Sequence, residues 1–137
     1  MSFREKSAWA MAVVMIGAGL WYLNMFVGTW RELGAVPPPM VVLPYVLLVV
    51  VASVVAQVVL AANDPRGANE RADERERPII AVAGNWSGMV LGAGTVAAAL
   101  HYMAHGDGNL LFHSVMGSLI LSSIAEYAFQ VALIRRA

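Results

Sequence analysis

Hydrophobic residues fall in four long stretches along the chain, and short clusters of charged or turn-forming residues separate them. Each stretch has about 20 residues or more, the length that an α-helix needs to cross the hydrocarbon core of a bilayer. The pattern predicts membrane-spanning helices at about residues 8–30, 41–62, 79–102 and 110–134. We expect them to form one transmembrane domain over residues 1–137.

Residues that favour caps and turns mark the ends of the predicted helices. Ser2 and Glu5 have the S-x-x-E spacing of a capping box at the start of the first helix. Pro37, Pro38 and Pro39 exclude a helix after the first span, because proline disfavours helical conformation in the residue before it. Residues 105–109, with two glycines, predict a tight turn between the last two helices.

Composition agrees with a chain that is surrounded mostly by lipid. The sequence is 59% hydrophobic and only 13% charged, which is far more apolar than an average soluble domain. The formal net charge is zero and no dense Lys/Arg tract occurs, so nucleic-acid binding is not expected. There is no cysteine, and no P-loop, HExxH or Ser-His-Asp pattern. We therefore expect neither enzymatic activity nor a cofactor.

Positively charged residues gather on one side of the predicted topology. Eight of the nine Lys and Arg residues lie before the first span, in the loop at residues 63–78, or at the carboxy terminus. Arg31 alone lies on the opposite side. Cytoplasmic loops of membrane proteins are enriched in Lys and Arg. We therefore expect an all-α, four-helix membrane bundle of two antiparallel transmembrane hairpins, with both termini in the cytoplasm.

Three segments resemble a family of small bacterial inner-membrane proteins. They are the opening Met1–Trp9, the Asp-Glu-Arg-Glu-Arg run at residues 73–77, and a last helix that ends in Arg135 and Arg136. The family has four helices and no assigned activity, so the resemblance implies an architecture and a bacterial inner-membrane location but no function. The chain departs from the family where Pro78, Ile79 and Ile80 follow the charged run.

Glu126 is the only acidic residue deep inside a predicted span, about 12 Å from the end of the last helix at about 1.5 Å per residue. Ser122 and Gln130 lie one turn away on either side, and Gln57 and Asn85 lie at comparable depth in other helices. We expect these five residues to form one polar cluster. It could be a proton-coupled binding site, or a hydrogen-bonded clasp that fixes the helices together.

Gly84, Gly88 and Gly92 form a repeated small-xxx-small pattern in the third span. Such a pattern lets another helix approach closely. We expect it to pack the third helix against the fourth, with the first helix at the periphery. Self-association through the same face is the alternative.

Three histidines lie near the predicted turn between the last two helices. His101 and His105 have i,i+4 spacing, and Asp107 and His113 follow. Imidazoles and one carboxylate could bind Zn²⁺ or a similar transition metal. The other interpretation is an ordinary belt of interfacial residues.

These patterns favour a membrane protein with a non-enzymatic interaction, accessory or sensing role. The alternative is a small proton-coupled transporter that uses Glu126. Four spans enclose little volume, so a transport pathway would form between protomers. Either function implies a homodimer or a larger complex in the lipid bilayer, and the sequence identifies no small-molecule substrate.

Overall fold

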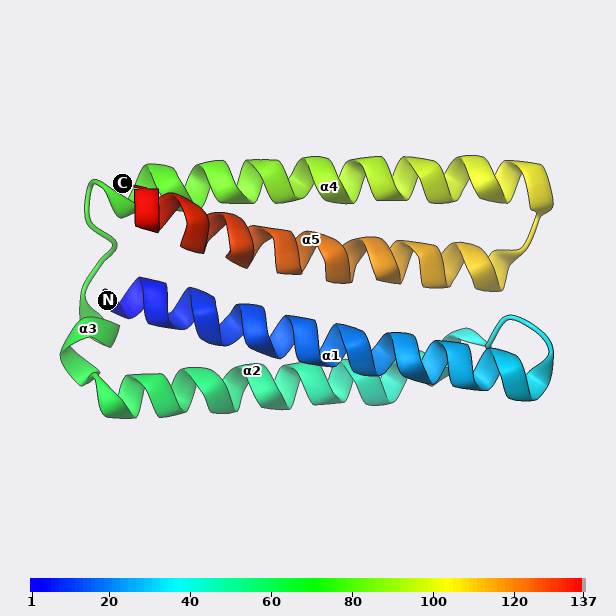
Figure 1. Ribbon diagram of the computed structural model, residues 1–137, viewed down its shortest axis with the longest axis horizontal. Coiled ribbons are helices and arrows are strands. Elements are labelled where there is room, and N and C mark those ends of the chain that lie inside the picture. The colour runs from blue at the N-terminus through cyan, green and yellow to red at the C-terminus, as the bar shows by residue number, and fades with distance from the viewer. Residues whose placement is uncertain (137) are drawn as a thin grey trace.

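The computed structural model describes residues 1–136, and within that range the ordered elements are helices, without strands. Four long helices lie side by side, and consecutive long helices run in opposite directions (Figure 1). They are α1 (Phe3–Leu33), α2 (Leu43–Asn63), α4 (Glu76–His105) and α5 (Gly108–Arg136). A 3₁₀ helix, η1 (Pro39–Val42), precedes α2, and a short helix, α3 (Pro65–Asn69), follows it.

All four long segments are long and apolar enough to cross a membrane. This confirms the number of spans that the sequence predicts. α1, α4 and α5 extend beyond their predicted bounds at both ends; α1 begins at Phe3 and α4 at Glu76. α2 instead begins at Leu43, two residues later than predicted, because η1 occupies the residues before it. The extensions carry some of the charged residues that lie outside the predicted spans, such as Arg4, Lys6 and Arg77, because a helix can continue past its apolar stretch without losing its backbone hydrogen bonds.

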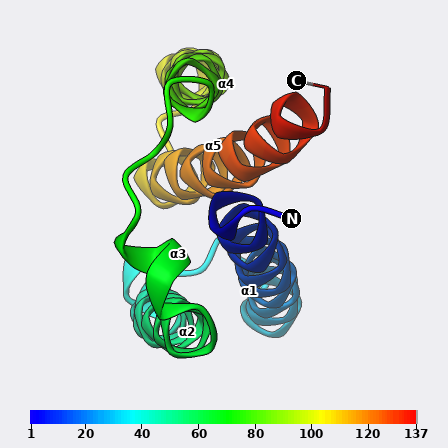
Figure 2. The same ribbon diagram turned by 90° about the vertical axis from the view of Figure 1, so that its left-hand side faces the viewer.

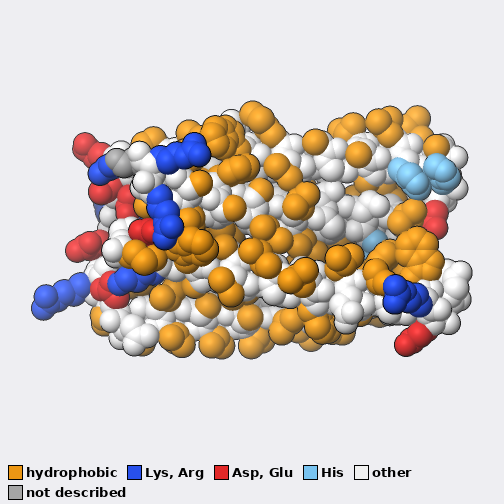
Figure 3. All heavy atoms as spheres, in the orientation of Figure 1, with side chains coloured by type: hydrophobic (Ala, Val, Ile, Leu, Met, Phe, Trp, Pro, Cys, Tyr) orange, Lys and Arg blue, Asp and Glu red, His pale blue; other side chains and the backbone are white. Residues whose placement is uncertain are grey.

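The bundle has two distinct ends. Both chain termini and the segment between α2 and α4 lie at one end, which we name the terminus end (Figure 1). The chain turns after α1 and after α4 at the other end, the turn end. Figure 3 shows charged side chains concentrated at the terminus end, with hydrophobic side chains along the length between the two ends.

Glycine and serine end or begin the helices as their chemistry predicts. The Ser2 hydroxyl accepts a hydrogen bond from the Glu5 backbone N–H at 3.2 Å, which confirms the predicted cap of α1. Gly34 and Gly106 follow α1 and α4 with φ of 64° and 68°. These left-handed conformations favour glycine, so both helices end where a glycine permits the reversal.

The helices follow one another across the bundle in the order α2, α1, α5, α4 (Figure 2). α1 packs against α2 and α5, and α5 also packs against α4. The expectation that the first helix is peripheral is therefore wrong. Small residues of α1, including the buried Ala8, Ala12 and Ala18, let two neighbours approach its backbone.

The buried core is small and lies where α1, α2 and α5 meet. Ala18, Tyr22, Tyr45 and Ile120 form it, and the rings of Tyr22 and Tyr45 make an edge contact at 5.1 Å between centroids. Most large apolar side chains of α2 are exposed, and Tyr45 is its one buried residue. Such exposure fits a helix whose surroundings are lipid.

Candidate functional site

Glu126 lies on α5, partly buried, and bonds within its own helix. The Gln130 side-chain amide donates to the Glu126 carboxylate at 3.3 Å, across the i,i+4 spacing. The bond joins no second helix. Glu126 and Gln130 are therefore a local pair on one element.

Ser122, the next predicted member of the cluster, points to a different neighbour. Its buried hydroxyl donates to the backbone carbonyl of Ser87 at 2.8 Å and so joins α5 to α4. Trp86 and Phe129 make an edge contact beside it, with ring centroids 5.2 Å apart. The side chain of Asn85 lies exposed on α4.

Gln57 bonds to a residue that the sequence analysis did not single out. Its side-chain amide donates to the Ser7 hydroxyl at 3.0 Å, and the same hydroxyl lies 3.2 Å from the Gln57 amide oxygen. This contact joins α2 to α1. The expected single cluster is thus divided into a pair within α5, an α4–α5 contact and an α1–α2 contact, because α1 separates α2 from α5.

The predicted packing glycines lie on an open face of α4. A Cβ atom added at Gly84, Gly88 or Gly92 would meet no atom within 4 Å. These glycines therefore do not make the expected contact between α4 and α5. Gly94 does so, since a Cβ atom there would lie 2.7 Å from Cβ of Ser118.

Small side chains continue this open face along the length of α4. The residues follow one another at intervals of three or four, which places them on one stripe of the helix. We name this surface the α4 outer face, and its members are Ala81, Gly84, Gly88, Gly92, Thr95 and Ala99. Asn85 borders it and supplies an exposed amide.

His113 is buried near the turn end and uses both ring nitrogens. Nδ1 lies 2.5 Å from the Tyr22 hydroxyl, and Nε2 lies 2.9 Å from the backbone carbonyl oxygen of Pro37. A carbonyl oxygen can only accept, so Nε2 carries a proton. His113 thus joins α5 to α1 and to the proline segment that precedes η1.

The remaining candidate metal ligands lie elsewhere. His101 and His105 are exposed on α4 with their rings stacked at 4.2 Å, and Asp107 caps α5 by accepting from the Leu110 N–H at 3.0 Å. Within residues 1–136, no three His, Asp or Glu side chains are placed to bind one metal ion. The expected site is not assembled, because His113 turns inward while His101 and His105 stay on the surface.

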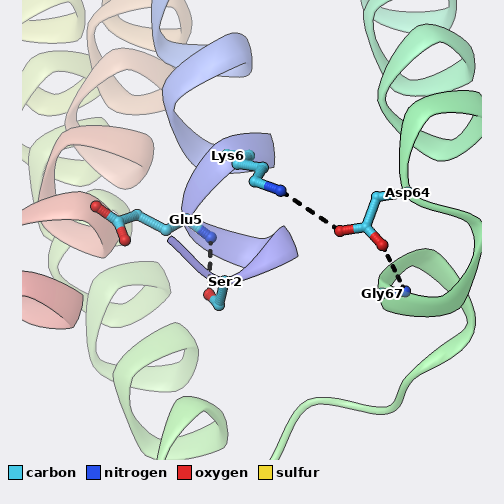
Figure 4. Close-up of polar contacts among 5 residues, drawn as sticks. All are labelled: Ser2, Glu5, Lys6, Asp64 and Gly67. Atoms are coloured by element: carbon cyan, nitrogen blue, oxygen red, sulfur yellow. Dashed lines mark hydrogen bonds and ion pairs between the residues drawn. The ribbon is translucent and has the colours of Figure 1, made fainter.

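A set of ionic contacts holds the terminus end together. Arg135 Nε donates to the Glu5 carboxylate at 3.2 Å, and its guanidinium lies 5.2 Å from the centre of the Trp9 ring. On the other side of α1, Lys6 pairs with Asp64 at 3.5 Å (Figure 4). Asp64 also accepts from the Gly67 N–H and so caps α3.

Sequence reasoning missed these contacts, as it missed the partners of His113. The Lys6–Asp64, Glu5–Arg135 and Tyr22–His113 contacts each join residues separated by more than 50 positions, and no local pattern relates them. The one available signal was position: Glu5 precedes the first predicted span and Arg135 follows the last, so both are expected at the same end of the bundle.

Comparison with known proteins adds no relative from which a role could be transferred. The chain matches no protein-family model, no curated protein and no solved structure.

Proposed function

We propose that this chain is a non-enzymatic interaction, accessory or sensing protein of the bacterial inner membrane, which assembles as a homodimer through the α4 outer face. The observation that carries the proposal is the open face itself. Three successive glycines on it, Gly84, Gly88 and Gly92, meet no atom of a neighbouring helix, and Ala81, Thr95 and Ala99 are exposed. In lipid, helices gain little from hiding apolar side chains, so association depends on close backbone approach.

Asn85 supports a partner on this face. It lies six residues inside the predicted span that begins at residue 79, hence about 9 Å from the edge of that span at about 1.5 Å per residue. An exposed amide at that depth finds no water to satisfy it, and an unsatisfied polar group in hydrocarbon costs several kcal/mol. A helix at the α4 outer face supplies the missing donor and acceptor.

A second copy of the same chain satisfies Asn85 best. An amide carries both a donor and an acceptor, so two Asn85 side chains related by a two-fold axis can bond reciprocally. The glycine stripe is likewise complementary to itself, since each copy lacks side chains where the other approaches. These properties favour a homodimer over a complex with an unlike helix.

The proposed orientation places the terminus end in the cytoplasm. Eight of the nine Lys and Arg residues lie in the first turns of α1 and α4, in the segment between α2 and α4, or in the last turn of α5. This distribution follows the rule that positive charge stays inside. The likeness to small bacterial inner-membrane proteins supports the same location.

Cysteine crosslinking tests the dimer without background, because the sequence has no cysteine. Gly88→Cys places a thiol on the α4 outer face, and Gly17→Cys places one on an open part of α1; neither position has an atom within 4 Å of an added Cβ. We expect mild oxidation in native membranes to give a disulfide-linked dimer with Gly88→Cys and monomer with Gly17→Cys.

A bulky substitution on the α4 outer face should disrupt the dimer that the crosslink traps. Gly88→Leu should prevent close approach and give a monomer by sedimentation in detergent, while Gly17→Leu should keep the dimer. A dimer that persists in Gly88→Leu, or equal crosslinking of the two cysteine variants, would contradict the proposal.

A proton-coupled transporter centred on Glu126 is the second proposal. One observation favours it: the partly buried carboxylate is hydrogen-bonded to the neutral Gln130 amide. An ionisable group at this depth of a membrane helix often serves proton or ion movement. In this proposal too the pathway forms between protomers, since Gln57 is bonded to Ser7 on the far side of α1.

A further inference from the structure

A groove of about 490 Å³ lies between α1 and α5. Its volume falls in the range of about 300 to 1,000 Å³ that is usual for sites that bind small molecules. Exposed Ile16, Leu20 and Leu121 line its rim, whereas Tyr22 and His113 are buried in its wall. The groove involves neither α4 nor the α4 outer face.

The chemistry of the wall favours a hydrocarbon occupant. Tyr22 and His113 present polar atoms, but these are already bonded to each other and, through Nε2, to Pro37. Ser114 adds one hydroxyl to an otherwise apolar lining. A ligand with many polar groups would leave them unsatisfied here, while an alkyl chain would leave none.

The length of the groove matches one leaflet of a bilayer. The groove residues of α5 extend from Leu110 to Ile124, and those of α1 from Ile16 to Phe26, over which α1 rises about 15 Å at about 1.5 Å per residue. This is about half of the hydrocarbon core, which is about 30 Å thick. Ser114 is close enough to the turn end to meet the ester groups of a lipid, and the groove below it accommodates the chain.

Arg31 supplies charge above the groove. Leu20, Leu23, Val27 and Arg31 follow one another at intervals of three or four residues, so Arg31 lies on the same stripe of α1 as two groove residues, toward the turn end. It is the only Lys or Arg between Lys6 and Arg66. A guanidinium binds phosphate oxygens through two parallel hydrogen bonds.

We propose that this groove binds one phospholipid from the leaflet at the turn end, with an acyl chain between α1 and α5 and the phosphate at Arg31. Gly117 is a position at which the groove can be filled. It lines the groove, and a Cβ atom added there would meet no atom within 4 Å. A larger side chain at this position therefore fills the groove without colliding with the fold.

Native mass spectrometry of the protein, released from detergent micelles after purification from membranes, tests the proposal. We expect wild-type protein to retain one phospholipid and Gly117→Leu to reduce the lipid-bound fraction at least about tenfold. Gly17→Leu is the matched control, since it adds the same side chain to an open part of α1 outside the groove, and it should retain the lipid.

Arg31→Gln tests the proposed contact between Arg31 and the lipid phosphate, and it does so without filling the groove. Arg31 is exposed, so its replacement leaves the core intact, and we expect weaker retention of the phospholipid. Wild-type protein without bound lipid, or equal retention by wild type and Gly117→Leu, would overturn the site. Unchanged retention in Arg31→Gln would overturn the phosphate contact.

The lipid site and the proposed dimer can be tested separately. Gly88→Leu should abolish the dimer and leave lipid retention unchanged, so failure of one proposal does not imply failure of the other.

Discussion

The Tyr22 hydroxyl lies 2.5 Å from Nδ1 of His113, 91 positions away in the sequence. The other nitrogen of the same ring bonds to the Pro37 carbonyl oxygen at 2.9 Å. One imidazole therefore holds together α1, α5 and the proline segment before η1. The contact is the main polar link between the first and last helices near the turn end, as the pair of Glu5 and Arg135 is at the terminus end.

Removal of the Tyr22 hydroxyl tests how much this link stabilises the bundle. Tyr22→Phe leaves Nδ1 of His113 buried without its partner, which should lower the free energy of unfolding by about 1 to 3 kcal/mol. Tyr102→Phe is the control, because Tyr102 is exposed on α4. Reversible unfolding in mixed detergent micelles measures the difference. Equal stability of the two variants would show that the bond contributes nothing.

The geometry also predicts the tautomer of His113. Because Nε2 donates to the Pro37 carbonyl, the neutral ring should carry its proton on Nε2 and accept the Tyr22 proton on Nδ1. Nitrogen NMR of the labelled protein in nanodiscs distinguishes the two tautomers by the shifts of the ring nitrogens. Exposed His101 should show a mixture. A proton found on Nδ1 alone would contradict the assignment.

Two glycines of α4, two positions apart, should respond differently to the same substitution. Gly94→Leu drives a side chain into Ser118 of α5, so it should separate the helices and cost about 1 to 3 kcal/mol of stability. Gly92→Leu enters open space and should leave the unfolding of the monomer nearly unchanged. Thermal unfolding at protein concentrations that keep the chain monomeric makes the comparison. The reverse order of the two variants would contradict the packing described for α4.

Replacement of Arg135 should lower the stability of the protein more than replacement of its neighbour Arg136. Arg135→Gln removes the partner of Glu5, whose side chain is only 12% exposed, and also removes the contact with Trp9. We expect a loss of about 1 to 2 kcal/mol, moderated because Arg135 itself is 60% exposed. Arg136→Gln should cost less than about 0.5 kcal/mol, as is usual for exposed positions. The difference between the variants should shrink in high salt, and a constant difference would argue against an ionic cause.

Glu126→Gln separates the two proposed functions. The amide that replaces the carboxylate can still bond to Gln130, so assembly through the α4 outer face and thermal stability should both be unchanged. If the chain is an interaction protein, its phenotype in cells should also be unchanged. A variant that assembles normally but loses proton uptake in proteoliposomes, or solute resistance in cells, would favour the transporter.

The number and approximate positions of the long helices could be predicted from the sequence because they depend on local properties. Hydropathy over about 20 residues sets the spans, and Ser2 and Gly106 mark helix ends through their own backbone chemistry. The order of the helices could not be predicted in this way. In lipid most side chains are exposed whichever neighbour a helix has, so hydrophobicity does not reliably mark the inner helices: the inner α5 and the outer α4 have nearly the same mean hydropathy, 1.5 and 1.4.

Predictions about side-chain partners failed for the same reason. Gln57 and Glu126 lie at similar depth, yet depth alone does not place two helices in contact, and α1 lies between them. The glycine pattern of α4 identified a surface with small residues but not what it faces. For His113, the sequence indicated proximity to a turn, while its burial depends on Tyr22 and Pro37, which come from other parts of the chain.

The central place of α1 has a consequence for biogenesis. Of the four long helices, α1 leaves the ribosome before the others, but its second neighbour, α5, leaves after them. Until α5 enters the membrane, α1 keeps one face without its final partner, and α4 cannot be joined to the first two helices. Insertion should therefore pass through a stage with an exposed α1 surface, on which a membrane insertase or chaperone could act before the last helix closes the bundle.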